Sequence, residues 1–363
     1  MKLLILTCST GGGHTSAARA IAEAAGERGC ECTIVDALDF LPGVDGKVIS
    51  HGHTFVYRHL PSIFGVGYRF ERRGGARAFR VECVRGAKNL ALYLDGGGFD
   101  AVISVHIFAS FMLAALRKRG RLELPTVNVA TDYTCSPGFA ECSLDLNCVP
   151  HGLKDEFVKC GLAPETVLET GIPVSREYGE SEPRRSAREM LDLPLEGPLA
   201  LLMCGSMGCG PMEWLAGELS RELPEGGTVA ALCGTNDRLR KSLSRSGLDN
   251  VRAVGFTRQV SLWMDAADLI ISKPGGLTSS EAMAKRLPMV VVDAVPGCET
   301  KNLEYLTSRG CAVTAPTEKI PALARGLLTE PERREKVREN IEKNFPQGAA
   351  LRIRDAVLAL IRG

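Results

Sequence analysis

The chain has 363 residues, 45% of them hydrophobic, which is enough for two domains of ordinary size. Its 44 basic and 43 acidic residues are balanced, which argues against a protein that wraps a nucleic-acid duplex. No apolar run approaches the roughly 20 residues that span a bilayer, and the first residues form a strand-like segment with no basic leader. We therefore expect no signal peptide, and a place in the cytoplasm or on a membrane surface.

Apolar runs alternate with helix-favouring stretches along most of the chain. In the first half, an alanine-rich helical stretch at 16–27 separates the first two of four predicted strands, which are Leu3–Leu6, Glu31–Val35, Ala101–Val105 and Thr126–Val129. After residue 195, five more strands are predicted at Leu199–Met203, Val229–Leu232, Val251–Val254, Leu269–Ile271 and Met289–Val292. This alternation predicts doubly wound α/β sheets.

The two sets of strands are separated by a segment, 173–198, that is rich in Arg, Glu, Ser and Pro and has no buried run. We place a linker there, between an N-terminal domain at 1–172 and a C-terminal domain at 199–345. Apolar residues at helical spacing predict an amphipathic helix within 346–363, which we expect to pack back on the first domain.

Three glycine-containing turns follow predicted strands and open helices. The most informative is Ser272-Lys-Pro-Gly-Gly-Leu-Thr-Ser-Ser-Glu281, where we expect the helix to begin at Thr278. Unpaired backbone N–H groups and the positive end of a helix dipole meet at such a turn, which favours a phosphate. The other two turns lie in Lys2–His14 and Leu199–Gly208. Three such turns in two halves predict a nucleotide-linked ligand held in a cleft.

His14 ends the first of these turns and is predicted to lie in the first turn of a helix. The helix dipole disfavours a charged imidazolium there, so a neutral ring would accept a proton near neutral pH. The alternative is a histidine that only caps or packs. A nicotinamide-binding fingerprint would need glycine where Ser16 stands, so we do not expect a dinucleotide-dependent oxidoreductase.

Several polar and aromatic residues of the second half have two interpretations each. Glu281 either completes a capping box with Thr278 or accepts hydrogen bonds from the vicinal hydroxyls of a ribose. Glu299 and Asn302, one helical turn apart, either face sugar hydroxyls or belong to a plain helix start. Phe256 follows a strand at the edge where open sheets bind ligands, and a planar base could lie beside it.

The 13 cysteines are expected to be reduced thiols, given the lack of a secretory signal. Three of them, Cys135, Cys142 and Cys148, lie close in sequence to His151 and could in principle bind zinc. Their spacing lacks a tight C-x-x-C pair, so we interpret them as small buried hydrophobic residues.

The stretch 68–88 carries seven basic and two acidic residues with aromatic side chains between them. Such a mixture suits adsorption to an anionic bilayer surface, although a plain solvated face is the alternative. The residues that we expect to bind the membrane are Arg69, Arg72, Arg73, Arg77 and Arg80.

Taken together, these motifs resemble the monogalactosyldiacylglycerol synthases and the bacterial processive diacylglycerol glucosyltransferases, which are family 28 glycosyltransferases of the GT-B fold. The resemblance covers most of the chain and rests on Gly11–His14, Gly171–Val174, Gly255–Thr257, Trp263–Asp268, Lys273–Glu281 and Pro296–Asn302. It implies an α/β fold of two Rossmann-like domains that face a cleft, with the nucleotide sugar bound mainly by the C-terminal half. It also implies inversion at the anomeric carbon without an essential metal or other cofactor.

Residue by residue, the resemblance implies that Glu281 binds the ribose, Phe256 lies at the uracil, and Glu299 and Asn302 bind the hexose. The other residues that we assign to the nucleotide sugar are Gly13, Ser206, Gly275, Gly276, Leu277 and Thr278. His14 becomes the candidate base or the residue that orients it. Asp132, which follows a predicted strand, is a second catalytic candidate.

The implied function is transfer of a hexose from a UDP-sugar to diacylglycerol or a related lipid, at the inner face of the cell membrane and without a nucleic-acid partner. Family members commonly carry Gln where Cys298 stands, so the donor hexose stays open. Three alternatives share parts of the pattern: transfer of N-acetylglucosamine to a polyprenyl-linked murein precursor, a UDP-sugar 2-epimerase, and a non-catalytic UDP-sugar sensor.

Overall fold

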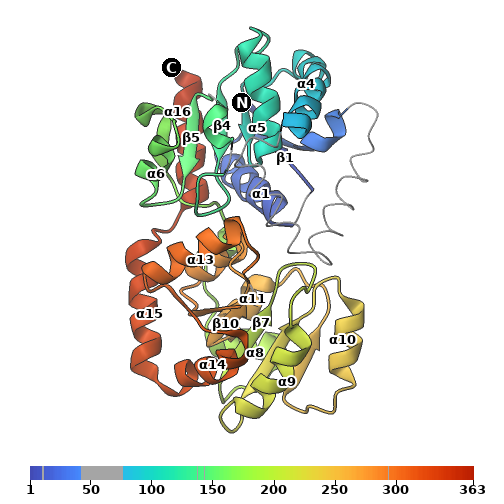
Figure 1. Cartoon of the computed structure of the whole chain (residues 1–363), viewed down its shortest axis with the longest axis vertical. Helices are drawn as coiled ribbons and strands as arrows, with labels where there is room; N and C mark the ends of the chain where they lie inside the picture. Colours follow the sequence, from blue (N-terminus) through green and yellow to red (C-terminus); the bar gives the residue numbers. More distant parts are fainter. Residues whose placement is uncertain (10–11, 42–76, 137, 143, 293) are drawn as a thin grey trace. The chain divides into compact units, whose positions relative to one another are not determined.

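The computed structural model describes residues 1–9, 12–41, 77–136, 138–142, 144–292 and 294–363 (Figure 1). The chain divides into two compact units, each of which is described by itself. Unit 1 comprises Met1–Arg176, Val295–Lys301 and Gly348–Gly363, and unit 2 comprises Glu177–Ala294 and Asn302–Gln347. No helix in these described ranges is long and apolar enough to cross a bilayer.

Unit 1 is built on a six-stranded sheet whose strands are all parallel, in the order β2-β1-β3-β4-β5-β6. The strands are β1 (Lys2–Thr7), β2 (Glu31–Asp36), β3 (Ala101–Ser104), β4 (Thr126–Val129), β5 (Leu146–Val149) and β6 (Val167–Glu169). The first four coincide with the predicted strands to within one residue at each end. The sequence did not reveal β5 or β6, which are short, and β6 lies at the edge of the sheet with Leu168 exposed.

Helices cover both faces of this sheet because successive residues of β1 point in opposite directions and the four from Leu3 to Leu6 are all apolar. Leu4 and Leu6 join one core cluster with α4 and α5, whereas Leu3 and Ile5 join the other with α1 and α16. The helices of unit 1 are α1 (Gly12–Gly26), α4 (Arg77–Gly97), α5 (Ile107–Lys118), α6 (Lys154–Lys159) and α16 (Ala349–Arg362).

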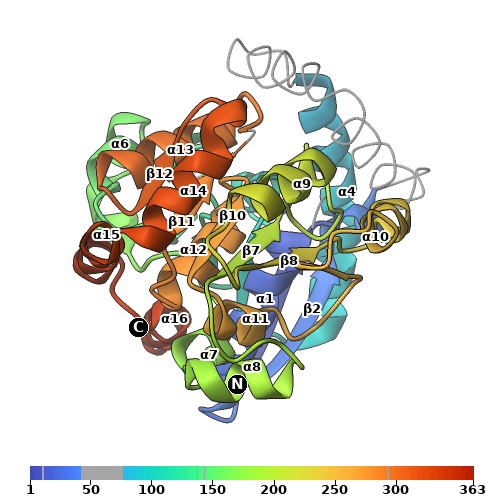
Figure 2. The same cartoon turned by 90° about the horizontal axis from the view of Figure 1, so that it is seen from below.

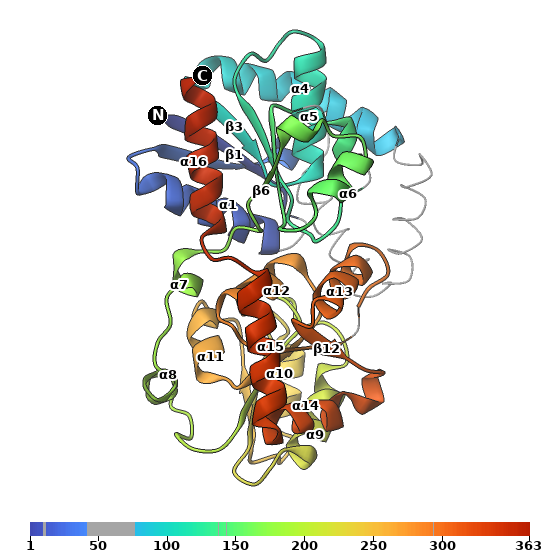
Figure 3. The same ribbon diagram turned by 90° about the vertical axis from the view of Figure 1, so that its left-hand side faces the viewer.

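The C-terminal helix α16 packs against α1, more than 300 residues away along the chain (Figure 3). Its apolar face places Ile353 and Val357 in the same core cluster as Ile21. On the same helix, Arg354 donates to Glu27 at 3.2 Å and to the carbonyl of Ala24 at 3.4 Å. The amphipathic pattern read in the sequence thus corresponds to a helix that completes the core of unit 1.

Unit 2 contains a second six-stranded parallel sheet, in the order β12-β11-β10-β7-β8-β9 (Figure 2). Its strands are β7 (Leu199–Met203), β8 (Thr228–Leu232), β9 (Val251–Val254), β10 (Leu269–Ser272), β11 (Met289–Val291) and β12 (Ala312–Thr314). Its helices, of which α7 and α13 begin in residues of unit 1, are α7 (Arg176–Gly179), α8 (Arg184–Met190), α9 (Met212–Glu222), α10 (Asp237–Ser244), α11 (Val260–Ala266), α12 (Gly276–Ala284), α13 (Cys298–Ser308), α14 (Ile320–Thr329) and α15 (Pro331–Asn344). The fold class is therefore the predicted one, two doubly wound parallel sheets.

The segment predicted to be a linker, 173–198, is divided between the two units. From Glu177 onward it belongs to unit 2, and its helix α8 packs on α11. Arg188 is only 1% exposed, and its guanidinium donates to the carbonyls of Ala266 and Gly197 at 3.0 and 2.9 Å. It also pairs with Asp268 at 3.2 Å. The sequence did not indicate that this segment is packed on unit 2, because its buried contacts are made by charged residues and not by apolar ones.

A second buried ion pair holds the same segment. The ammonium of Lys285 lies 2.7 Å from the carboxylate of Asp265, with both side chains less than a tenth exposed, and also donates to the carbonyl of Glu180. Asp268 in turn accepts the backbone N–H of Leu199, where β7 begins, at 2.8 Å. The two acids of the Trp263–Asp268 motif therefore fasten the segment onto the amino end of the sheet.

We predict that Arg188→Ala lowers the free energy of unfolding of unit 2 by about 3 kcal/mol, because it removes one partner of a buried ion pair. Denaturant titrations followed by tryptophan fluorescence measure this directly, since both tryptophans, Trp214 and Trp263, lie in unit 2. Arg185→Ala is the matched control, because that exposed arginine pairs with Glu189 on the same helix and should cost less than about 1 kcal/mol. Equal losses in the two variants would contradict the proposed anchor.

Candidate functional site

The site residues of unit 1 come from three successive strand ends of its sheet. His14 lies in the first turn of α1, which follows β1, as predicted. Its ring contacts the backbone of Val105, just after β3, and the side chain of Thr131, just after β4. Because the strands are parallel, these ends meet at one edge, where open α/β sheets bind ligands.

The hydrogen bonds of His14 determine its tautomer. Its Nδ1 lies 3.0 Å from the carbonyl oxygen of Val105 and 3.1 Å from Oγ1 of Thr131. A carbonyl oxygen only accepts, so Nδ1 carries the hydrogen and donates it. Nε2 then keeps its lone pair, and it makes no hydrogen bond with any residue that the structure describes. The geometry leaves Nε2 as a proton acceptor.

The protonation state agrees with this tautomer. Burial lowers the pKa of His14 from its ordinary value of 6.5, and this effect is larger than the opposing effects of the Asp132 charge and the Val105 carbonyl. The ring is therefore neutral near pH 7, which a general base requires. Asp132 follows β4 and is close enough to act on the charge of His14, so the structure brings the two catalytic candidates together.

A second histidine, which the sequence reasoning missed, packs on this ring. The centroids of His14 and His106 lie 4.5 Å apart with the rings almost perpendicular. His106 is the N-cap of α5, and its Nδ1 accepts the backbone N–H of Phe108 at 3.2 Å. Its position directly after β3 was the available signal, because that is the same strand edge that pointed to His14.

The basic residues assigned to the membrane cannot be placed. Arg69, Arg72 and Arg73 lie outside the residues that the structure describes. Arg77 and Arg80 are in the first turns of α4, but their side chains are also outside the description.

The residues considered as possible zinc ligands have other contacts in the structure. Cys148 lies in β5 within an apolar core cluster, and Cys142 belongs to the other cluster of unit 1. Nε2 of His151 lies 3.1 Å from the guanidinium of Arg352 on α16. In the part of the chain that the structure describes, no three potential metal ligands gather at one point.

In unit 2, the turn between β10 and α12 has the features of an anion site. The helix begins at Gly276, with Gly275 as its N-cap, two residues before the predicted start at Thr278. The carbonyl of Gly275, the N-cap, accepts the first helical hydrogen bond from the backbone N–H of Ser279 at 3.0 Å. The N–H groups of Gly276, Leu277 and Thr278 thus precede the helix's own bonds and are available to a phosphate.

Asn302 holds this turn through a side-chain hydrogen bond to its backbone. Its side chain is fully buried, and Nδ2 donates to the carbonyl of Pro274 at 2.9 Å. The direct contact with a hexose that we expected of Asn302 stays a prediction. Its place in the fold is that of a positioning residue, which holds the residue before Gly275 and Gly276.

The capping-box interpretation of Glu281 is wrong. Because α12 begins at Gly276, Thr278 lies inside the helix and is not its cap. The carboxyl of Glu281 instead lies beside Tyr178 of α7, within the segment first taken for a linker. Burial raises the pKa of Glu281 to about 8, a hydrogen bond from Tyr178 lowers it, and the nearby Glu177 charge raises it. No motif in the sequence indicated Tyr178.

The remaining assigned residues lie at turns after strands or at a helix start. Phe256 follows β9 and is 65% exposed, as a surface available to a planar base would be. Ser206 is exposed in the turn after β7, and its carbonyl accepts the N–H of Thr235 at 2.9 Å. A Cβ at Gly234 would come within 2.1 Å of that carbonyl, so these two turns can approach only with glycine there.

Glu299 lies in the first turn of α13, and its Oε2 accepts the backbone N–H of Val295 at 2.7 Å. This contact ties the helix start to the segment that precedes it. The other carboxylate oxygen has further acceptor capacity, so the bond is compatible with a sugar contact and does not require one.

Comparisons with known proteins match both halves of the chain. The family model of monogalactosyldiacylglycerol (MGDG) synthase matches residues 14–174, and that of the glycosyltransferase family 28 C-terminal domain matches residues 199–354. The processive diacylglycerol beta-glucosyltransferase of Bacillus subtilis is 26% identical over 94% of this chain and 90% of that enzyme. The chloroplastic monogalactosyldiacylglycerol synthase of Spinacia oleracea is 30% identical over 85% of this chain and 62% of that enzyme.

Other matches are more partial or more distant. The processive diacylglycerol beta-glucosyltransferase of Staphylococcus carnosus is 28% identical over 58% of this chain, and the match spans about half of that enzyme, 54%. Among solved structures, MurG of Acinetobacter baumannii has a TM-score of 0.61 at 18% identity, with 99% of each chain covered. A putative UDP-N-acetylglucosamine 2-epimerase from Listeria monocytogenes reaches 0.66 at 14% identity, covering 99% of this chain and 96% of that one. At these identities the structures share the fold and nothing further is inferred from them.

The raised pKa of Glu281 predicts a pH-dependent stability of unit 2. Between the ordinary value of 4.5 and about 8, the unfolded chain has released the proton that the folded chain still holds. Rising pH across this range therefore destabilises the folded state, and the loss is complete above pH 8. Glu281→Gln cannot ionise, so its stability relative to the natural chain should increase from pH 5 to pH 9.

Denaturant titrations followed by tryptophan fluorescence at both pH values test this. Glu225→Gln, an exposed position in the same unit, is the control and should track the natural chain at each pH. A constant difference between Glu281→Gln and the natural chain would mean that the carboxyl is already ionised at pH 5.

Proposed function

Because the chain belongs to the family 28 glycosyltransferases of the monogalactosyldiacylglycerol synthase type, we propose that it transfers a hexose from a UDP-sugar to diacylglycerol or a related membrane lipid, with inversion at the anomeric carbon. The observation that carries the proposal is the geometry of His14. A neutral imidazole with Nδ1–H bonded to Val105 and Nε2 left to accept is the arrangement that a transferase needs to activate a hydroxyl.

In the proposed reaction, Nε2 of His14 takes the proton of the acceptor hydroxyl. The hydroxyl oxygen forms a bond to the anomeric carbon, and the bond from that carbon to the diphosphate oxygen breaks on the opposite face. The nearby Asp132 charge stabilises the imidazolium that forms. The proton of the acceptor hydroxyl thus ends on Nε2 of His14, and UDP leaves with the electron pair of the broken bond.

The turn from Gly275 to Thr278 is proposed to receive the negative charge of the leaving diphosphate. Three N–H groups at a helix N-terminus stabilise such charge without reorganisation, which is why the proposal requires no metal or other cofactor. Glu281 would hold the ribose, Phe256 would lie at the uracil, and Ser206 and Gly13 would contribute further contacts. Glu299 remains the proposed contact for the hexose.

The acceptor decides where the protein works. Diacylglycerol resides in a bilayer, so a transferase that uses it as acceptor acts at the membrane surface. The basic stretch 68–88 supports this location by its composition. We propose a peripheral enzyme on the inner face of the cell membrane. The hexose stays open, because Cys298, at the first position of α13, is a weak hydrogen-bond partner compared with an amide.

We predict that the protein releases UDP from a UDP-hexose only when vesicles containing diacylglycerol are present, and that His14→Ala lowers transfer by about 10²- to 10⁴-fold. The affinity for UDP should change little, because His14 is not among the residues proposed to bind the nucleotide sugar. Product analysis with a panel of UDP-hexoses identifies the sugar, and calorimetry measures UDP binding by the variant.

Ser16→Ala, two residues along the same helix, is the control and should keep its activity. Free sugar-nucleotide isomers formed in water alone would identify an epimerase instead. Product formation on a polyprenyl-linked acceptor but not on diacylglycerol would replace the proposed acceptor. A large loss of UDP affinity in His14→Ala would contradict the role assigned to that residue.

A further inference from the structure

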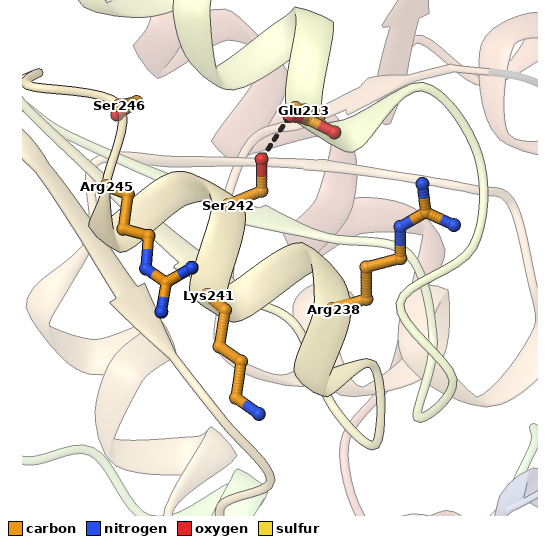
Figure 4. Close-up of a pocket in the computed structure, with 6 residues that line it drawn as sticks. All are labelled: Glu213, Arg238, Lys241, Ser242, Arg245 and Ser246. Atoms are coloured by element: carbon orange, nitrogen blue, oxygen red, sulfur yellow. Dashed lines mark hydrogen bonds between the residues drawn. The ribbon is translucent and has the colours of Figure 1, made fainter.

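Unit 2 has a cavity of about 680 Å³ at helices α9 and α10, and none of its lining residues is assigned to the nucleotide sugar (Figure 4). The helices α9 and α10 pack on each other, and α10 with the two residues after it supplies all of the lining except Glu213. The residues that line the cavity are Glu213, Arg238, Lys241, Ser242, Arg245 and Ser246.

The cavity is cationic. Arg238, Lys241 and Arg245 are spaced three and four residues apart, so they share one face of α10, from its first turn to its C-cap. None of them forms an ion pair with an acid in the described residues, whereas Arg240, on another face, pairs with Asp237 at 3.3 Å. The carboxylate of Glu213 accepts a hydrogen bond from Ser242 at 2.5 Å. Three cations against one carboxylate leave the lining with excess positive charge.

An exposed aromatic residue is the sequence neighbour of Glu213, one of the lining residues. Trp214 follows Glu213 on α9 and is 42% exposed, while Met212 and Leu215 on either side are fully buried. Burying an indole in a bilayer interface is favourable, because its apolar body and its polar N–H both find suitable surroundings there. A solvent-exposed tryptophan on α9 and uncompensated cations on the adjoining α10 are therefore a combination that suits a membrane surface.

We propose that this face of unit 2, which we call the α10 basic face (Arg238, Lys241, Arg245 and Trp214), binds the phosphate headgroups of an anionic membrane. From Arg238 to Arg245 the helix rises about 10 Å, so the cations are spread over two turns and face several headgroups better than one small ion. Charge complementarity selects anionic lipid. The binding is separate from hexose transfer, since these residues take no part in the proposed chemistry.

The test uses the full chain and vesicles of phosphatidylcholine with or without phosphatidylglycerol. The variant R238Q/K241Q/R245Q is expected to bind the anionic vesicles roughly tenfold more weakly or worse, because each cation near an anionic surface contributes measurably to binding. The matched control is R333Q/K336Q/K343Q, which removes the same charge from the exposed surface of α15. It should bind like the natural chain.

A second readout reports on the α10 basic face alone. Brominated phosphatidylglycerol should quench the fluorescence of Trp214, whereas Trp263 is 5% exposed and should be unaffected. Trp214→Phe should abolish the quenching, and R238Q/K241Q/R245Q should reduce it. Transfer by the triple variant to diacylglycerol in neutral detergent micelles should be unchanged, which separates this proposal from the proposed function.

Three results would overturn the proposal. One is equal weakening of vesicle binding in the two triple variants, which would assign it to net charge. Another is no quenching of Trp214 by brominated lipid at vesicle concentrations where the natural chain is bound. The third is binding of inorganic phosphate in a way that depends on Arg238, Lys241 and Arg245 while vesicle binding does not, which would assign the cavity to a soluble anion.

Discussion

All the strands of both sheets run parallel, and this constraint determines where polar groups can gather in each unit. Parallel strands place their carboxyl ends at one edge, and each following helix begins there with unpaired N–H groups. In unit 1, the ends of β1, β3 and β4 bring His14 into hydrogen-bond contact with Val105 and Thr131, each more than 90 residues away along the chain. In unit 2, the end of β10 leads directly into the turn at Gly275 and Gly276.

The opposite edge of the sheet in unit 2 is held by buried charges. Arg188 and Asp268 pair there, and a second pair, Lys285 and Asp265, lies close by along the chain. Buried ion pairs add little net stability, but losing one partner is costly, so they specify one arrangement of the segment that they join. Here that segment contains Tyr178, which reaches the carboxyl of Glu281. The two buried ion pairs thus help to position Tyr178 against Glu281, the residue proposed to bind the ribose.

The fold was largely predictable, because long apolar strands such as Leu199–Met203 have a strong pattern of their own. The edge strands β6 and β12 were not, because each has three residues and only one of them is buried. The strand β5 was also missed, although β3 and β4 are equally short and were predicted. His14 was predictable from a turn motif and the helix dipole. His106, Tyr178 and the support from Asn302 were not, because each depends on contacts between segments that are distant in sequence. The start of α12 was predicted at Thr278, two residues late, because both glycines were interpreted as turn residues. This error led to the incorrect prediction of a capping box between Thr278 and Glu281.

The account depends most on the state of the His14 ring, which nitrogen-15 NMR of histidine-labelled protein observes directly. The chain has six histidines, and the spectrum of a His14→Gln variant identifies the signals of this one. The account predicts a neutral ring at pH 7 with the hydrogen on Nδ1, which protonates only below the ordinary value of 6.5. A ring that is doubly protonated at pH 7, or neutral with the hydrogen on Nε2, would contradict it.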